Sequence, residues 1–486
     1  MAGPTNSGSG GSKNSIKIFA NIFISFIGAG ILGLPFAFKE AGILEGALIM
    51  TFVGFISVKA MLLIIDCKYQ LMGKKLDSNT ERSYIHTDDG LTEGHEEEYK
   101  ELINEGEMMI RVKDPPKPIG DDLTYGDVGF HAMGPIGKLL VDMAIVISQT
   151  GFCCAYLIFI VKNLSDYITG VSIFSWLAIL LPPLTLLTLI RHLNSLALSS
   201  LMAQVSNIFA FGVVFWFDFE HLYTVRIHPK EMSIKGFPFF LAIAIYCYEG
   251  AGMILSLESS VAQEKRHKFK KIFIISMVLA TTLYITFGSA GYLSFGPQTN
   301  PIITLNLPKG SSVDFSMVVK SSLCLALLFT YPVMMFPVMK ILERILIADA
   351  DKHYWRGNIL RCIMVSLTGI IVVLIPSFSN LMALIGSTCC TLLAFILPGV
   401  FHLYIFKGSL TRSQKFLDYF LILMGIVGSV VGLWDALKRL SEGEDEDLEV
   451  VEKVITTLST VTNNTMISLT EHLKLTTREI LKNTTS

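Results

Sequence analysis

The chain has 486 residues, of which 51% are hydrophobic and only 16% are charged. A soluble protein of this length needs more polar side chains to cover its surface, so the composition indicates an integral membrane protein. The formal net charge of -2 excludes the basic balance of a nucleic-acid-binding protein, and it makes the positions of the charges along the chain the informative quantity.

Eleven apolar runs are long enough to cross a lipid bilayer as helices. The hydrocarbon core is about 30 Å thick and needs about 20 apolar residues in a helix. The sequence therefore predicts an all-α integral membrane protein with about eleven transmembrane helices. The runs are 16–37, 42–65, 137–161, 173–190, 193–217, 237–257, 272–293, 315–339, 359–375, 381–406 and 416–437.

Basic residues gather in alternate loops between the predicted helices. Positive loops stay in the cytosol, so this pattern predicts a cytosolic N-terminus. Because the number of helices is odd, the C-terminal tail then lies on the other side, which is compatible with its glycosylation sequons at Asn463 and Asn483. The basic residues are Lys265, Arg266, Lys268, Lys270 and Lys271 after the sixth run, Arg344, Lys352 and Arg356 after the eighth, and Lys407, Arg412 and Lys415 after the tenth.

The hydrophilic segments define the remaining boundaries. We expect a disordered cytosolic N-terminal tail at 1–14, helices 1 and 2 at 15–66, a disordered acidic cytosolic loop at 67–124, helices 3 to 11 at 125–437 and an extracytosolic acidic and Thr-rich tail at 438–486. The loop has too few apolar residues to offset the entropy cost of ordering. It is either a solvated spacer or a segment that binds a cytosolic partner.

Glycines interrupt two of the predicted helices near the membrane centre. Helix 1 contains GAGILGLP at 28–35, and helix 6 contains EGAG at 249–252. Each of these helices opens a block of five, and because five is odd the two blocks enter the membrane from opposite sides. The pattern predicts a 5+5 inverted repeat, in which interrupted helices at matching positions build the substrate site.

An interrupted helix leaves N–H and C=O groups without partners, which a membrane tolerates only where the backbone lines a cavity or meets a ligand. An amino acid suits such ends, because its carboxylate pairs with free N–H groups and its ammonium with free carbonyls. The alternative is that the glycines only permit close helix packing. The candidate substrate-binding residues are Gly28, Ala29, Gly30, Ile31, Leu32, Gly33, Tyr246, Cys247, Glu249 and Gly250.

One carboxyl group lies deep in the predicted membrane. Glu249 is nine residues from Glu258 at the end of its helix, or about 13 Å, which is too far for it to reach water. Burial favours the neutral form of a carboxyl group, so Glu249 is a candidate proton carrier or partner of the substrate ammonium. The alternative is that it caps the interrupted backbone of helix 6.

Three further polar residues are candidates for the same interior. Asn21 and Ser25 share one face of helix 1 by their i, i+4 spacing, and Gln149 lies in helix 3. We assign Asn21 to proton coupling and Ser25 and Gln149 to the edge of the pocket. Each of these residues can equally be part of hydrogen-bonded packing.

Several kinds of chemistry are not expected. Seven of the eight cysteines lie in apolar runs and none has metal-ligand spacing with histidine, so the sequence predicts no disulfide framework, metal or cofactor. The match of residues 28–33 to G-x-G-x-x-G lacks a preceding strand and is not a dinucleotide site. Because no nucleophile, base and oxyanion set is present either, we expect a protein that is not an enzyme.

Four segments carry a family resemblance. They are 28–38 followed by Ala41 and Gly42, then 125–129 with 134–137, then 148–153, and last 246–250. These segments resemble the amino acid/auxin permease family, and within it the vacuolar amino-acid transporters and their proton-coupled animal relatives. The resemblance covers residues 15 to about 437.

The resemblance implies a LeuT-type fold of eleven helices with helices 1 and 6 unwound at the midplane, and amino acids moved by alternating access. It implies a vacuolar or lysosomal membrane, with the plasma membrane as the alternative. Asn21 stands where proton-coupled animal members carry histidine, and Ile24 stands where sodium-coupled relatives carry asparagine. Transport is therefore expected to be proton-linked or facilitative. The rival function is an amino-acid sensor that signals through the acidic loop.

Overall fold

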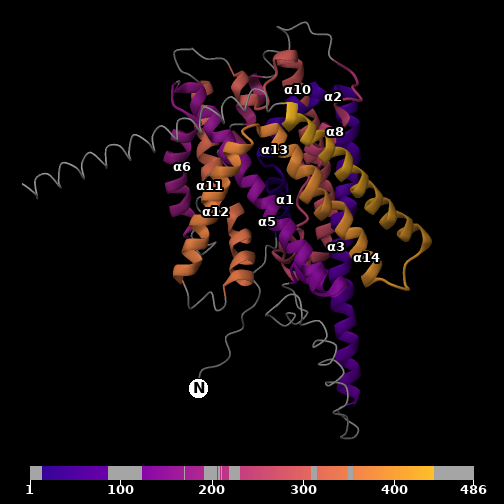
Figure 1. The fold of residues 1–486 in the computed structure, drawn as a ribbon. Coiled ribbons are helices and arrows are strands. Elements are labelled where there is room, and N and C mark those ends of the chain that lie inside the picture. Colours follow the sequence, from indigo (N-terminus) through magenta and orange to yellow (C-terminus); the bar gives the residue numbers. More distant parts are fainter. Residues whose placement is uncertain are drawn as a thin grey trace, which may run out of the picture. The chain divides into compact units, whose positions relative to one another are not determined.

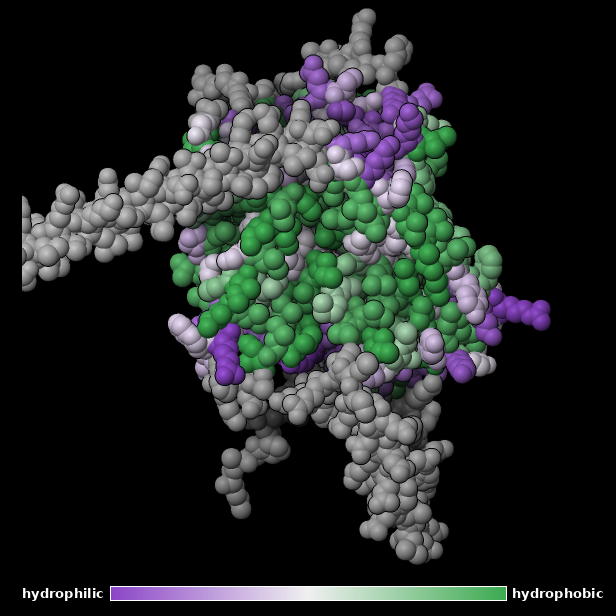
Figure 2. Space-filling model, in the orientation of Figure 1, coloured by the Kyte–Doolittle hydropathy of each residue, from purple (hydrophilic) through white to green (hydrophobic). Residues whose placement is uncertain are grey.

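A computed structural model describes residues 14–85, 123–168, 170–190, 205, 208–209, 211–217, 230–307, 315–347 and 354–442. In this part of the chain the elements are helices, and seven of them are long and apolar enough to cross a membrane, or eight if one bent pair is counted as a single span. On the face drawn in Figure 2, hydrophobic side chains gather in a broad band with hydrophilic side chains at its edges. The prediction of an all-α membrane protein is confirmed.

The first span is the bent pair. Helix α1, Ser15–Phe26, begins after Asn14, whose side chain accepts a hydrogen bond from the Ile16 N–H at 2.9 Å. The 3-10 helix Ala29–Gly33 and helix α2, Leu34–Ala41, continue the chain at an angle of 47° to α1. The break falls at Gly28, in the glycine-rich segment of the sequence.

Helix α3, Ile43–Ile85, continues beyond residue 66, where the acidic loop was expected to begin. The reason is visible at Lys68, whose ammonium lies 2.6 Å from the Glu258 carboxylate with both side chains buried. These hydrophilic residues are held inside the protein, which hydropathy along the sequence does not reveal. The rest of the expected loop, 86–122, lies outside the described residues, as do the tails 1–13 and 443–486.

Helix α5, Tyr125–Tyr167, begins with a capping box, in which Thr124 and Asp127 each accept a hydrogen bond from the backbone N–H of the other. It bends at Gly134, which has a φ of 67° and precedes Pro135. Most of α5 is buried, and it packs against α11, α12, α13 and α14. In Figure 1 it runs between the α11–α12 pair and α14.

The middle of the chain contains a second interrupted helix. Helix α6 spans Ile173–Thr188, and only part of the predicted run 193–217 is described. Helix α8, Phe237–Cys247, and helix α9, Ile254–Ser259, are separated by a turn that contains Glu249 and Gly250. The 3-10 helix Gln263–Lys268 and helix α10, Phe269–Phe295, follow.

The last third of the chain contains four further labelled helices. They are α11, Phe315–Leu346, α12, Tyr354–Leu374, α13, Phe378–Ile385, and α14, Leu397–Ile405, with π-helical turns at Gly386–Cys390 and Leu392–Ile396 between the last two. A final helix spans Arg412–Glu442. The chain divides into two compact units, 1–434 and 435–486, and the described residues of the second unit, 435–442, are helical. Because the run 193–217 is only partly described, the count of eleven crossings stays a prediction.

Helix α8 packs closely against the π-helical turn that follows α13. This contact fixes the position of the second break, the one after Cys247. A Cβ added at Gly386 would lie 2.0 Å from the carbonyl oxygen of Ala242 on α8, so only glycine fits there. Helix α8 also packs against α2 and α3. The break after Cys247 is thereby held beside the break that follows Phe26.

Candidate functional site

The two helix breaks lie against each other. A Cβ added at Gly30 would lie 3.0 Å from the Cys247 sulfur, and a Cβ added at Gly250 would lie 2.2 Å from the ring of Phe26. Glycine at these two positions lets each broken segment approach the other more closely than any other residue would allow.

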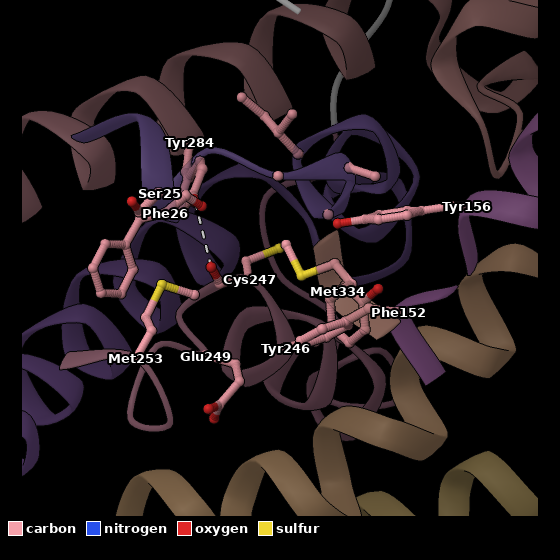
Figure 3. Close-up of a pocket in the computed structure, with 14 residues that line it drawn as sticks. Ser25, Phe26, Phe152, Tyr156, Tyr246, Cys247, Glu249, Met253, Tyr284 and Met334 are labelled. Atoms are coloured by element: carbon pink, nitrogen blue, oxygen red, sulfur yellow. Dashed lines mark hydrogen bonds between the residues drawn. The ribbon is translucent and has the colours of Figure 1, made fainter. Parts of the chain in front are cut away.

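Tyr284 of α10 joins the two breaks. Its hydroxyl donates to the carbonyl oxygen of Phe26 at 2.5 Å, and the carbonyl oxygen of Cys247 lies 3.3 Å from the same hydroxyl. Figure 3 draws the contact with Cys247. Phe26 and Cys247 are the last residues of α1 and α8, where carbonyls have no partner within the helix. One buried phenol therefore contacts both helix ends.

A cavity of about 50 Å³ lies between the breaks, and we call it the central cavity. An apolar cavity of about 150 Å³ takes up one benzene molecule, so most amino acids need more room than this conformation offers. The lining residues are Ser25, Phe26, Gly28, Ala29, Gly30, Ile31, Phe152, Tyr156, Tyr246, Cys247, Glu249, Met253, Tyr284 and Met334.

Among the described residues, Glu249 is the single carboxyl group in this lining. Its side chain is buried and accepts hydrogen bonds from the backbone N–H groups of Ala251 and Gly252, while its Oε2 atom has no hydrogen-bond partner in the described structure. In Figure 3 the carboxyl group points away from the sulfur atoms of Cys247 and Met334. The side chain thus caps the turn with one oxygen and leaves the other available to a ligand.

Aromatic and sulfur-containing side chains form the rest of the wall. The rings of Phe152 and Tyr246 meet edge to face with centroids 4.7 Å apart. Tyr156 and Met334, from α5 and α11, lie on the same side in Figure 3. Among the described residues that form the lining there is no lysine, arginine or histidine. The wall is therefore shaped for a neutral apolar group, with one acidic position.

The residues predicted from sequence divide into two groups. Those that line the central cavity are Ser25, Gly28, Ala29, Gly30, Ile31, Tyr246, Cys247 and Glu249. Leu32, Gly33, Gly250, Asn21 and Gln149 are not among its lining residues.

Packing accounts for two of these five. A Cβ at Gly33 would lie 3.1 Å from the Met382 sulfur, and Gly250 meets Phe26. These two glycines allow close packing, as the alternative interpretation held. Asn21 is exposed, and its carbonyl accepts a hydrogen bond from the Ser25 hydroxyl at 2.6 Å.

Sequence reasoning missed six lining residues. Phe152 lies in one of the segments that carry the family resemblance, and this is the one signal that could have found any of them. The others come from apolar stretches in which nothing along the sequence sets them apart. The six are Phe26, Phe152, Tyr156, Met253, Tyr284 and Met334.

Comparison with known proteins finds relatives that are named as amino acid transporters. The Arabidopsis thaliana amino acid transporter AVT3B is 32% identical over 452 residues, which cover 88% of this chain and 94% of that protein. Amino acid transporter ANT1 from the same plant is 33% identical, with 89% and 95% covered. A solved structure of a Na+-coupled sialic acid symporter matches with a TM-score of 0.42 and 11% identity over 88% of this chain and 97% of that one, which is too distant to carry an argument.

The family match extends over most of the chain. The family described as transmembrane amino acid transporter protein matches residues 12–87 and 108–438. Both broken helices and all residues of the central cavity lie within these ranges. The family named by the sequence resemblance is thereby confirmed, and its relatives are transporters, not enzymes. The chain belongs to the transmembrane amino acid transporter family.

Proposed function

We propose that this protein is a secondary transporter that moves amino acids by alternating access, with the substrate bound in the central cavity. The observation that carries the proposal is that two helix breaks, far apart in sequence, face one cavity and share the Tyr284 hydroxyl. Helix ends that face a cavity at this depth suit a ligand that carries both a carboxylate and an ammonium group.

The substrate carboxylate binds at the start of the helical segment Ala29–Ala41. The first N–H groups of a helix have no partner within it, and they attract anions. Gly28 and Ala29 line the cavity, and a Cβ added at Gly28 would meet no atom within 4 Å. Glycine at 28 is thus not required by packing, which supports a role in leaving the backbone open to the ligand.

The substrate ammonium or a proton binds at Glu249. The free Oε2 atom accepts either one, and the two compete because a protonated carboxyl group loses its attraction for a cation. This competition provides a route to proton-linked transport. Asn21 is exposed and lies outside the cavity lining, which favours Glu249 over Asn21 as the coupling residue.

The wall of the cavity favours amino acids with neutral and apolar side chains. Phe152, Tyr156 and Met334 offer aromatic and thioether surface, and the lining contains no basic side chain that would pair with an acidic substrate. A second carboxylate would lie near Glu249 without a compensating cation. Sodium is not required in this proposal, in keeping with Ile24 at the position where sodium-coupled relatives carry asparagine.

Alternating access requires the cavity to open to each side in turn. Its small volume in this conformation supports a state that must widen to take up substrate. On the charge pattern of the loops, we place the N-terminus in the cytosol, the hydrophilic loop on the same side and the C-terminal tail on the opposite side. On the family resemblance, we place the protein in a vacuolar or lysosomal membrane.

The test is transport by purified protein in liposomes. Uptake of a labelled mixture of amino acids is followed with and without a pH gradient, for the wild type, for Glu249→Gln and for Glu231→Gln, which makes the same change at an exposed position. Uptake that rises with the gradient and falls only in Glu249→Gln supports proton-linked transport through Glu249.

The other outcomes are equally informative. Uptake that neither the gradient nor Glu249→Gln changes means a facilitator in which Glu249 caps the turn. Absence of uptake for every amino acid, in vesicles where binding is measurable, rejects transport and leaves the sensor function.

A further inference from the structure

A second buried acid–base pair lies outside the central cavity. The Nδ1 atom of His402 on α14 is 2.8 Å from the Oδ2 atom of Asp418 on the helix Arg412–Glu442. Both residues are buried, and the Oδ1 atom of Asp418 has no hydrogen-bond partner in the described structure. Nothing in the proposed transport site uses this pair.

The pair lies close to one face of the membrane. His402 is three residues from Ile405, where α14 ends, and Asp418 is six residues into its helix. The connecting residues 407–409 and 411–416 are exposed. At 1.5 Å per residue the pair is therefore about 5 to 9 Å along the helices from that aqueous face.

Buried titratable groups extend from the pair toward the central cavity. Helix α14 packs against α3 and α5, and the ring of Tyr125 on α5 meets Phe401, the neighbour of His402, with centroids 5.9 Å apart. Tyr125 is within electrostatic range of Glu249 and of Cys67 on α3. Cys67 is in turn within range of Asp418.

Few other charges face the pair from these elements. Asp66 of α3 also acts on Cys67, and it is engaged with the ammonium of Lys270. The π-helical turn Leu392–Ile396 contains only apolar residues, and Tyr404 of α14 is exposed. No lysine or arginine side chain is recorded in contact with His402 or Asp418 among the described residues, so the pair has no basic partner other than its own imidazole.

We propose that His402 and Asp418 form a second proton-binding site, separate from Glu249, that takes up a proton from the aqueous face beside residues 407–416 during the transport cycle. The proposal rests on the proposed function. A buried carboxyl group costs free energy when its charge is not compensated, and a proton held between it and the neighbouring imidazole supplies that compensation. Imidazole is the side chain that exchanges protons between about pH 5 and 8.

The test is exchange transport at equal pH on both sides of the liposome membrane. One labelled amino acid that the wild type transports is placed on both sides, and the rate is measured between about pH 5 and 8. The double variant His402→Gln/Asp418→Asn keeps two polar groups of similar size without a titratable proton. Tyr404→Phe is the matched control on the same helix, and Glu249→Gln is measured in parallel.

We expect the double variant to show less than half of the wild-type variation of rate with pH, each profile being scaled to its own maximum. Tyr404→Phe should follow the wild type. Asp418→Asn alone leaves the imidazole of His402 beside an amide. This single variant replaces the double variant in the test if the double variant does not fold. If the two sites are separate, the change of the pH profile caused by Glu249→Gln and the change caused by the double variant must add when the substitutions are combined.

The contrary outcomes are distinct. A wild-type profile in the folded double variant overturns the proton site and leaves the proposed transport function intact. Failure of both pair variants to fold assigns the pair to structure and also overturns the proposal. If the wild type exchanges no amino acid, the proposed function fails first and the proton site fails with it.

Discussion

The hydroxyl of Tyr284 lies 2.5 Å from the carbonyl oxygen of Phe26, the last residue of α1. The same hydroxyl is 3.3 Å from the carbonyl oxygen of Cys247 at the end of α8. A single helix, α10, thus holds the ends of both broken helices next to the cavity. A movement that separates α1 from α8 must break at least one of these contacts.

Replacing this hydroxyl is expected to destabilise the conformation in which the two helix breaks lie against each other. Tyr284→Phe removes one of the two hydrogen bonds of the Phe26 carbonyl, which keeps its bond from the Gly28 N–H at 3.1 Å, and the loss costs about 0.5 to 1.5 kcal/mol. The melting temperature should fall, and the exchange rate should change with it. Tyr331→Phe is the control, because it removes a hydrogen bond of 2.7 Å to the Thr368 hydroxyl from the interior of α11, away from both helix ends. Equal effects of the two variants would contradict a special role of Tyr284.

Two glycines at the breaks should respond differently to the same change. Gly250→Ala brings a Cβ to 2.2 Å from the Phe26 ring, and the forced repacking should cost about 1 to 3 kcal/mol of stability. Gly28→Ala meets no atom within 4 Å and its backbone is extended, so the melting temperature should stay unchanged. If Gly28 leaves room for the substrate carboxylate, Gly28→Ala should still raise KM for amino-acid uptake. Wild-type KM in Gly28→Ala would contradict carboxylate binding at this position.

The buried ion pair of Lys68 and Glu258 should be sensitive to loss of its carboxylate. Glu258 also accepts a hydrogen bond from the Tyr69 hydroxyl at 2.5 Å and lies 3.7 Å from Arg266. Glu258→Gln removes the buried carboxylate that Lys68 and Arg266 share, which should cost about 3 to 5 kcal/mol. Lys68→Met should cost less, because Arg266 remains beside the carboxylate. Melting temperatures of the two variants test this order.

An exposed acidic residue supplies the control for that comparison. Glu442 pairs with Lys438 at 3.5 Å, with both side chains more than half exposed. Pairs of this kind contribute about 0 to 1 kcal/mol, so Glu442→Gln should leave the melting temperature unchanged. A fall as large as that of Glu258→Gln would mean that burial does not govern the effect.

The size of the cavity should set the size of the substrate. Met334→Ala removes a side chain from the wall and enlarges the central cavity, so amino acids with larger side chains should compete better for uptake. Removing a few methylene-sized groups from a pocket changes relative kcat/KM by roughly 10- to 200-fold. Met317→Ala, at an exposed position on the same helix, should leave the selectivity unchanged. Unchanged selectivity in Met334→Ala would place the substrate side chain elsewhere.

Composition and local pattern were enough for the class of protein and for much of the helix arrangement. A chain that is 51% hydrophobic has to be solvated by lipid, and each long apolar run has to form a helix because its backbone finds no other partner there. The helix ends at Phe26 and Cys247 also lie next to the glycine-containing segments that the sequence singled out. These features depend on neighbours in the sequence.

Contacts between distant segments required the tertiary structure. Tyr284 and Met334 reach the cavity from apolar helices in which they look like packing residues, and Lys68 meets Glu258 across 190 positions of the chain. The loop was expected to begin at residue 67, but this residue lies inside α3. Hydropathy shows that Lys68 is polar, but it does not show that Lys68 pairs with a buried carboxylate. Local propensity and hydropathy determine where helices form, whereas the partners of buried polar groups are decided only when the helices pack.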